Sequence, residues 1–281
     1  VMVCSEKLFK NELKRLNTRI NFQKFKGNDS LSKSNIFIID IPFNNKDLSV
    51  KNKNLYIKKS FDVGLNLIKE NSSLALINGP ISKSTFLKGK YNGMTEYLAY
   101  KTKSLNEVML IFNKELSVSP ITTHIPINKV TDKIKKKIIV SKITSINKFY
   151  KKFFKFEPNI AITGLNPHCE TFAGKNIEKT EILPAIKILK KKKIKILGPF
   201  SADTIFLKKK RKEFDVVVGM YHDQVLIPIK TLFNFKAINI TLGLPFIRIS
   251  PDHGPNSPML GKNISDPASF FYAMKFAEKM K

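Results

Sequence analysis

Short apolar runs alternate with longer amphipathic stretches along most of this chain. Apolar runs bounded by polar residues are typical of strands buried on both faces of a sheet. Apolar residues that recur every three or four positions predict helices instead. The predicted strands span 74–79, 108–112, 159–165, 194–198, 215–220, 225–229 and 237–243, and the predicted helices span 136–154, 178–191 and 266–280.

The order of these elements predicts the fold class. Strand–helix alternation is typical of an α/β protein whose largely parallel sheet is covered by helices. A chain of 281 residues can form one large α/β unit or two lobes. Asp266 and Pro267 supply an N-cap and a first-turn proline for the last helix, and segment 25–35 is the most loop-like. The chain has no glycine-rich dinucleotide fingerprint and no P-loop, so a nucleotide must be held in another way.

The net charge of +28 raises the alternative of a nucleic-acid-binding protein. Lysine runs lie at 133–137, 190–193 and 208–212, but neither interleaved aromatic residues nor a known binding motif accompanies them. The chain is rich in Lys, Asn and Ile, has four arginines and no Trp, and this pattern indicates a bias toward AT-rich codons. We therefore expect solvated lysines and no specific nucleic acid. Steeply salt-dependent DNA or RNA binding would favour the alternative.

The composition also bears on the compartment. No apolar run approaches the roughly 20 residues that span a bilayer, so we expect no membrane segment. The first residues lack the basic start and apolar core of a signal peptide. Cys4 and Cys169 cannot form a disulfide framework, which suits a reducing cytoplasm.

Ionisable and polar residues are concentrated between residues 221 and 254. Such side chains at the ends of buried strands are where α/β enzymes collect their ligand-binding groups. Arg248 is notable because a chain that uses lysine almost everywhere keeps an arginine there, and its planar fork suits a phosphate or a carboxylate. The residues of this segment that we consider candidates are His222, Asp223, Lys230, Asn239, Arg248, Asp252 and His253.

Each of the four histidines follows an apolar, strand-like run. They are His124, His168, His222 and His253. Imidazole is a common ligand of divalent metals, and three imidazoles with an open position can form a catalytic site. The separations are too long to act as a motif, so this placement supports convergence on one cleft only weakly.

Seven motifs give the chain a specific resemblance to the 4-hydroxythreonine-4-phosphate dehydrogenase family of vitamin B6 biosynthesis. The segment 253–267 is also similar to the cofactor loop of the isocitrate and isopropylmalate dehydrogenases. The motifs are NGPISKSTF (78–86), GMTEYLA (93–99), TTHIP (122–126), GLNPH (164–168), GPFSADTIF (198–206), MYHDQVLIPIK (220–230) and NITLGLPFIRISPDHG (239–254).

The resemblance implies a two-lobed α/β/α fold like that of isocitrate and isopropylmalate dehydrogenases, with the active site in the cleft between the lobes. The chain would be one unit over 1–281, with a middle lobe at roughly 93–231, and would form a cytoplasmic homodimer. The implied reaction is NAD-dependent oxidation and decarboxylation of 4-phosphooxy-L-threonine to 3-amino-2-oxopropyl phosphate, in the biosynthesis of pyridoxine 5'-phosphate.

The resemblance also implies roles for individual residues. A divalent metal (Zn, Mg or Co) would be bound by His124, His168 and His222, with the ligands shared across the dimer. The substrate would be bound by Thr95, Lys230, Asn239 and Arg248, and NAD by His253, Gly254 and Asp266. The catalytic candidates are Lys230, Asp223 and Asp252; the two aspartates remain alternatives for the general base, and each could equally support a ligand histidine.

The chain departs from the family pattern at two places. The family's first strand and its GDPAGIGPE-like turn have no counterpart before VMVCSEKLF, so we expect an N-terminally truncated sequence with an exposed sheet edge. Met94 stands where the family carries a substrate-contacting histidine, and its thioether is only a weak acceptor. A dehydrogenase of another phosphorylated hydroxy acid, such as a phosphorylated threonate or erythronate, is therefore the alternative enzyme.

Overall fold

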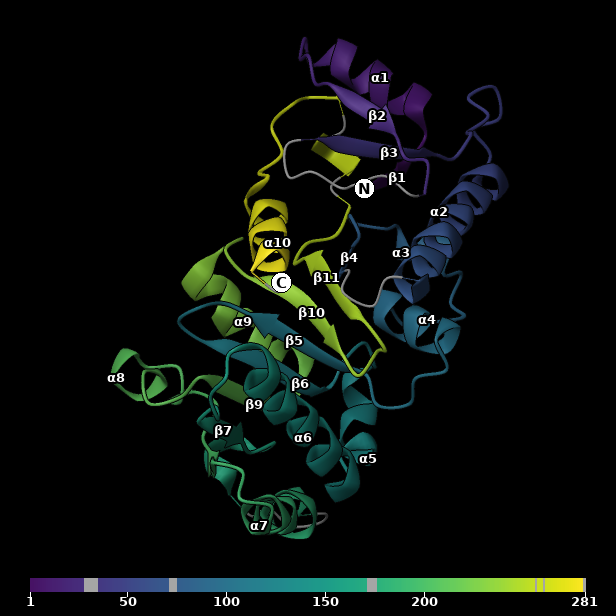
Figure 1. The fold of residues 1–281 in the computed structure, drawn as a ribbon. Helices are drawn as coiled ribbons and strands as arrows, with labels where there is room; N and C mark the ends of the chain where they lie inside the picture. Colours follow the sequence, from purple (N-terminus) through teal and green to yellow (C-terminus); the bar gives the residue numbers. More distant parts are fainter. Residues whose placement is uncertain (28–34, 71–74, 171–175, 256, 260, 280–281) are drawn as a thin grey trace.

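The computed structural model describes residues 1–27, 35–70, 75–170, 176–255, 257–259 and 261–279. Within these ranges, eight strands form one main sheet in the order β4, β11, β10, β5, β6, β9, β7 and β8 (Figure 1). The strands are β4 (Ala75–Ile77), β5 (Val108–Phe112), β6 (Ser117–Thr122), β7 (Ile160–Thr163), β8 (Ile196–Phe200), β9 (Val216–Tyr221), β10 (Ile238–Leu242) and β11 (Ile247–Pro251).

The main sheet is mixed rather than largely parallel. β6, β9, β7 and β8 run parallel to one another, and β4 is parallel to β11. β5 and β10, however, run antiparallel to both of their neighbours. The prediction of a largely parallel sheet is therefore corrected at these two strands. The apolar composition of a strand does not reveal its direction, because parallel and antiparallel strands are both apolar runs when their two faces are buried.

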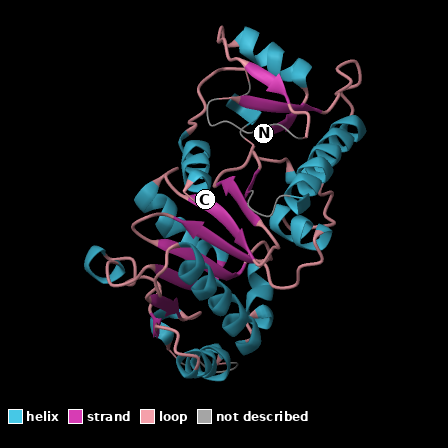
Figure 2. Ribbon diagram, in the orientation of Figure 1, coloured by secondary structure: helices cyan, strands magenta, loops and turns pink. Residues whose placement is uncertain are grey.

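Helices cover both faces of the main sheet (Figure 2). Side chains alternate between the faces of a strand, and on β5 Val108 and Leu110 enter one apolar cluster while Met109 and Ile111 enter another. The first cluster also contains residues of α6 (Lys136–Phe153), α7 (Leu183–Lys191) and α10 (Ala268–Glu278). The second contains residues of α9 (His222–Phe233). The face covered by α9 is the one that carries the candidate substrate residues described below.

The predicted strand at 225–229 is wrong, because this run belongs to α9. Val225, Leu226 and Ile229 are buried, whereas Ile227 is 62% exposed, and this spacing fits one face of a helix. A short continuous apolar run does not distinguish a buried strand from a buried helix. Pro228 lies inside this helix, and a proline in the interior of a run argues against a helix when only the sequence is considered.

The other predicted elements are confirmed with shifts of one or two residues at their ends. The predicted helix 178–191 begins with a wider turn, Glu178–Ile182, before α7. Asp266 accepts a hydrogen bond from the backbone N–H of Ala268, the first residue of α10, but Pro267 occupies the N-cap position predicted for Asp266. The sequence interpretation did not include β6 and β11, and most of the loop predicted at 25–35 lies outside the described residues.

The N-terminal part forms a second, three-stranded parallel sheet with β3 at its centre. β1 of this sheet and β4 of the main sheet are edge strands, and both line a cavity of about 700 Å³ together with α2 and α10. The predicted lobe boundaries near residues 93 and 231 stay a prediction. The elements of this part are β1 (Met2–Cys4), α1 (Glu6–Arg15), β2 (Phe22–Lys24), β3 (Ile36–Asp40), α2 (Val50–Glu70), α3 (Lys83–Phe86) and α4 (Met94–Lys101).

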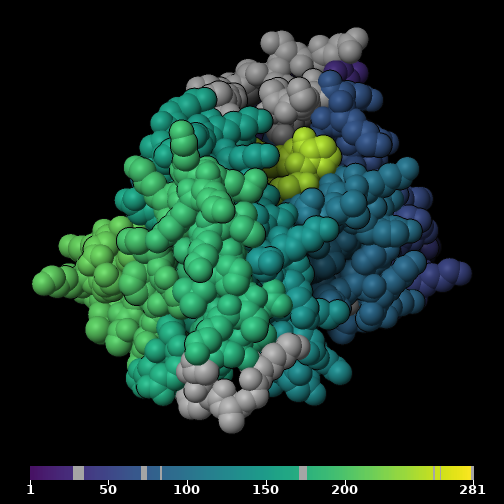
Figure 3. All heavy atoms as spheres, turned by 90° about the horizontal axis from the view of Figure 1, so that it is seen from below, coloured from purple at the N-terminus to yellow at the C-terminus, as the bar shows by residue number. Residues whose placement is uncertain are grey.

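Two further α-helices are short, α5 (Val130–Lys133) and α8 (Lys208–Arg211), and single turns of 3-10 helix span Ile127–Lys129, Pro167–Cys169 and Ser257–Met259. α8 has no buried residue and projects from the side of the molecule, as the green segment at its edge shows (Figure 3). The lysine run at 208–212 is therefore largely solvated, as expected. Within the described ranges, every helix is either too short or too polar to cross a lipid bilayer.

Candidate functional site

Three of the four histidines follow strands that lie side by side. β6, β9 and β7 are adjacent and parallel, so their carboxyl ends meet at one edge of the sheet. His124 comes two residues after β6, His222 directly after β9, and His168 in the turn after β7. The fourth, His253, follows β11. The expectation that each histidine follows a strand is thus confirmed.

His124 and His222 form a pair. Their ring centroids are 5.6 Å apart, with the ring planes tilted by 44°. The Nδ1 atom of His222 lies 2.6 Å from Asp223 Oδ1, and the Nδ1 atom of His124 lies 3.8 Å from Glu96 Oε1. A carboxylate at Nδ1 is the usual arrangement behind a metal-binding imidazole, because it leaves Nε2 for the metal. The donor chemistry of this pair therefore fits a divalent cation.

His168 does not join this pair within one chain. Its side chain is 65% exposed and its Nδ1 lies 3.9 Å from Asp203 Oδ2. Its backbone is in the left-handed region, with φ at 53°. Among the described residues, no three metal-ligating side chains of one chain come together. The predicted triad is therefore present as two adjacent histidines and one exposed histidine.

Two buried polar side chains that the sequence interpretation missed hold the histidine-bearing turns. Glu178 accepts hydrogen bonds from the backbone N–H groups of Leu165 and Asn166, at 2.9 and 2.8 Å, just before His168. Gln224 accepts from the backbone N–H of Met220 at 2.6 Å and donates to the Gly164 carbonyl at 2.8 Å. Gln224 thus ties the end of β9 to the turn after β7. The sequence feature that points to Gln224 is its position two residues after His222 in the MYHDQ motif.

Arg248 is buried, with only 3% of its surface exposed. Its Nε donates to Asn78 Oδ1 at 2.8 Å and its Nη1 donates to Thr241 Oγ1 at 3.1 Å. The Thr241 hydroxyl also lies 3.4 Å from that of Thr95. Burial lowers the pKa of Arg248 to about 10, so the guanidinium stays charged at neutral pH. Among the described residues no carboxylate forms a direct ion pair with Arg248, although the charge of Glu96 acts on it, and a buried, charged arginine of this kind is suited to receiving an anion.

Asn239 and Lys230 lie on the same side of the sheet as Arg248. Asn239 pairs with Ser250 and Thr241 pairs with Arg248 across the two strands, so these side chains share one face. On β5 their partners are Ile111 and Met109, which pack under α9. Lys230 is carried by α9 itself, about 12 Å along the helix from His222.

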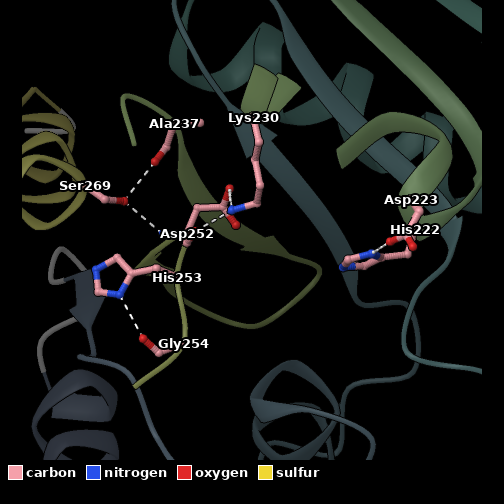
Figure 4. Close-up of polar contacts among 8 residues, drawn as sticks. All are labelled: His222, Asp223, Lys230, Ala237, Asp252, His253, Gly254 and Ser269. Atoms are coloured by element: carbon pink, nitrogen blue, oxygen red, sulfur yellow. Dashed lines mark hydrogen bonds and ion pairs between the residues drawn. The ribbon is translucent and has the colours of Figure 1, made fainter. Parts of the chain in front are cut away.

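Lys230 is paired with Asp252 (Figure 4). Its Nζ lies 2.9 Å from Asp252 Oδ2 and donates to the Asp252 carbonyl at 2.6 Å. Burial raises the pKa of the Asp252 carboxyl, although the charge of Lys230 opposes this. Ser269 fixes the segment, since it accepts from the Asp252 N–H and donates to the Ala237 carbonyl. Asp223, in contrast, is exposed beside His222.

The predicted cofactor residues lie after β11 and before α10. The His253 Nδ1 is 3.0 Å from the Gly254 carbonyl, and its ring meets Phe235 edge-on at 6.2 Å. A Cβ at Gly254 would meet nothing within 4 Å, so this glycine leaves open space. Asp266 accepts a hydrogen bond from Ala268 at the start of α10, and two residues of the intervening loop, 256 and 260, lie outside the described residues. Their role in cofactor binding stays a prediction.

Met94 and Thr95 are the first residues of α4. Met94 is only 7% exposed and belongs to an apolar cluster with Phe61, Tyr97 and Leu98. Thr95 is also buried and faces Thr241 of β10. Met94, at the position where the resemblance implies a histidine, thus contributes to packing.

The Glu96 side chain was not among the predicted site residues, yet it lies between α4 and the end of β6. Its Oε1 accepts a hydrogen bond from the Thr123 hydroxyl at 3.1 Å and faces His124. Burial by itself would raise the pKa of the Glu96 carboxyl, but its hydrogen bonds and the positive charge available on His124 hold that pKa below its usual value. Glu96 is therefore an ionised carboxylate within the site.

Comparisons with known proteins give one family along the whole chain. The family described as pyridoxal phosphate biosynthetic protein PdxA matches residues 1–277. A 4-hydroxythreonine-4-phosphate dehydrogenase of Sulfurihydrogenibium sp. (strain YO3AOP1) is 39% identical over 291 aligned residues, which cover 100% of this chain and 88% of the relative. A relative of the same name from Aquifex aeolicus (strain VF5) is 39% identical over 73% of this chain and 64% of its own length.

Solved structures agree with this assignment. A crystal structure of 4-hydroxythreonine-4-phosphate dehydrogenase from Klebsiella pneumoniae is similar with a TM-score of 0.82 and 28% identity, covering 99% of this chain and 89% of the other. An isocitrate dehydrogenase from Methylococcus capsulatus is similar with a TM-score of 0.50 and 14% identity over 77% of this chain and 70% of the other. At that identity the second likeness concerns the fold alone, and it confirms the predicted fold class.

Proposed function

The chain belongs to the family of pyridoxal phosphate biosynthetic protein PdxA, and on that premise we propose that it oxidises and decarboxylates 4-phosphooxy-L-threonine with NAD and a divalent metal. The product would be 3-amino-2-oxopropyl phosphate, a precursor of pyridoxine 5'-phosphate. The observation that carries the proposal is the buried, charged Arg248 on the sheet face that also bears Asn239 and is covered by the helix of Lys230. This arrangement favours a small dianionic substrate.

Four side chains would bind this substrate. Arg248 has two of its nitrogens engaged by Asn78 and Thr241, while its Nη2 has no hydrogen-bond partner among the described residues. It can therefore donate to a phosphate or carboxylate oxygen without losing its supports. Thr95 and Asn239 add neutral polar groups on the same side, and Lys230 adds a second cation.

The metal would be held by His124 and His222 of one chain and by His168 of a second copy. The exposure of His168 supports this division, because the residue can reach a neighbouring chain but is not grouped with the other two in its own. When bound, such a cation supplies positive charge at the oxygen on which negative charge develops, and NAD supplies the hydride acceptor. Asp223 would fix the orientation of the His222 ring through its contact with Nδ1.

Lys230 and Asp252 would move the protons. Lys230 Nζ lies 2.9 Å from Asp252 Oδ2, so the two groups are placed to exchange a proton, and burial raises the pKa of the carboxyl and makes it a better proton acceptor. We further propose a homodimer in the cytoplasm, where Cys4 and Cys169 would remain reduced.

Cofactor choice gives a first test of the proposal. We expect NADH formation from 4-phosphooxy-L-threonine and a clear preference for NAD over NADP. The reason is that no basic residue directly follows His253 to receive a 2′-phosphate. Initial rates with each cofactor, measured at matched metal concentration, provide the comparison. Preference for NADP would contradict this part of the account.

Met94 keeps a second candidate function open, the oxidation of a phosphorylated threonate or erythronate. If the substrate is 4-phosphooxy-L-threonine, Met94→His should tighten its binding by about ten- to a hundredfold, since a hydrogen bond to a charged group contributes about 1.5–3 kcal/mol. The variant should also lose some thermal stability, because Met94 packs among apolar residues. The measurements are KM for each substrate and the unfolding temperature. Lower activity of the variant on 4-phosphooxy-L-threonine would favour the second candidate.

A further inference from the structure

Glu96 connects the element that carries Thr95 with the turn that carries His124. We propose that Glu96 is a positioning residue whose carboxylate orients the His124 imidazole for metal binding. The proposal deepens the proposed function and rests on it, since it takes His124 as a metal ligand. It assigns a role to a side chain that the sequence interpretation did not select.

The contacts of Glu96 are directed at His124 and its neighbour. Glu96 Oε1 lies 3.8 Å from His124 Nδ1 and accepts from the Thr123 hydroxyl at 3.1 Å. The Glu96 and His124 side chains are 22% and 25% exposed, so solvent screens their interaction only in part. At 3.8 Å the Glu96 carboxylate acts on the ring through its charge and not through a hydrogen bond, and a negative charge on the Nδ1 side favours the tautomer with hydrogen on Nδ1, which leaves Nε2 as the metal-binding atom.

Gly93 shows how closely these groups are packed. A Cβ at this position would lie 2.7 Å from Glu96 Oε2 and 2.9 Å from His124 Nδ1. The backbone of Gly93 is extended, so the glycine is required here by space and not by its dihedral angles. The absence of a side chain at Gly93 thus leaves the space in which the Glu96 carboxylate and the His124 imidazole lie next to each other.

A purely structural role for Glu96 has to be separated from the proposed one. Glu96 is in the first turn of α4, where an acidic side chain also stabilises a helix through its free N–H groups. Glu96→Gln distinguishes the two roles. Glutamine retains the size of the side chain and an acceptor oxygen for Thr123 and the helix, but it loses the negative charge that faces His124.

The test is the affinity of the protein for Zn²⁺, measured by competition with a chromophoric chelator and without substrate or NAD. We expect Glu96→Gln to weaken Zn²⁺ binding by about ten- to a hundredfold, the usual effect of removing a carboxylate behind a ligand histidine. Its unfolding temperature without metal should stay close to that of the unmodified protein. Glu213→Gln, which removes an exposed carboxylate paired with Lys210, is the matched control and should leave the affinity unchanged.

His124→Ala, alone and combined with Glu96→Gln, separates failure of this proposal from failure of the proposed function. If Glu96 acts through His124, adding Glu96→Gln to His124→Ala should weaken Zn²⁺ binding no further. Unchanged affinity in Glu96→Gln, or an equal loss in the His124→Ala background, would overturn the positioning role alone. Unchanged affinity in His124→Ala would overturn the metal site and the proposal that rests on it.

Discussion

His168→Ala is expected to lower kcat/KM by about a thousandfold or more and to remove most of the bound metal, although the side chain is largely exposed. Loss of a metal ligand removes several kcal/mol of charge stabilisation, and about 1.4 kcal/mol corresponds to a factor of ten in rate. The fold should be unaffected, because the His168 side chain is 65% exposed. The measurements are metal content, steady-state kinetics and the unfolding temperature. The same losses are expected for His124→Ala and His222→Ala.

Mixing two inactive variants tests whether the site is shared between chains. A dimer of one His168→Ala chain and one His222→Ala chain would contain one complete site, because His124 and His222 come from the first chain and His168 from the second. Refolding the two variants together should therefore restore part of the activity, which each variant alone lacks. His253→Ala is the control histidine, and it should retain full metal occupancy. Full occupancy in His168→Ala would refute the assignment of this residue as a ligand.

Arg248→Lys is expected to raise KM for the phosphorylated substrate by about ten- to a hundredfold or more, although the substitution retains the positive charge. Lysine offers one ammonium group, whereas Arg248 uses separate nitrogens for Asn78 and Thr241 and keeps a third for a ligand. Each lost hydrogen bond to a charged group contributes about 1.5–3 kcal/mol. We expect the change in substrate binding to exceed the change in stability, as measured by KM and by thermal unfolding.

Arg211→Lys provides the matched control for this substitution. Arg211 belongs to α8, which projects into solvent and has no buried residue. The same chemical change there should leave both KM and kcat close to those of the unmodified protein. Kinetics of Arg248→Lys that resemble those of Arg211→Lys would show that Arg248 does not bind substrate.

Much of the fold and of the site could be predicted from the sequence. Strands such as Val216–Tyr221 are unbroken apolar runs, so their composition predicts burial on both faces. The residues that follow the parallel strands β6, β9 and β7 meet at one sheet edge, and this placement gives weak support for His124, His168 and His222, whose role as metal ligands is implied by the family resemblance. The run 225–229 resembles a strand in its sequence because a helix buried along one side gives a similar short apolar pattern.

The supporting residues could not be predicted in the same way. Glu96, Glu178 and Gln224 act through contacts with residues that are distant in the sequence, and their letters alone do not differ from those of surface residues. Periodicity indicates which face of an element is buried, but not which polar group on another element will meet it. The packing of Met94 in an apolar cluster likewise depends on the helix and the strands around it.

The most direct test of the central claim is the stoichiometry of the reaction with 4-phosphooxy-L-threonine labelled with ¹³C at its carboxyl carbon. The account predicts that the protein, supplied with NAD and Zn²⁺, releases one labelled carbon dioxide for each NADH formed, and that His168→Ala releases neither above background. NADH without carbon dioxide would contradict the decarboxylation. Absence of both products with this substrate, together with turnover of a phosphorylated threonate, would contradict the proposed function.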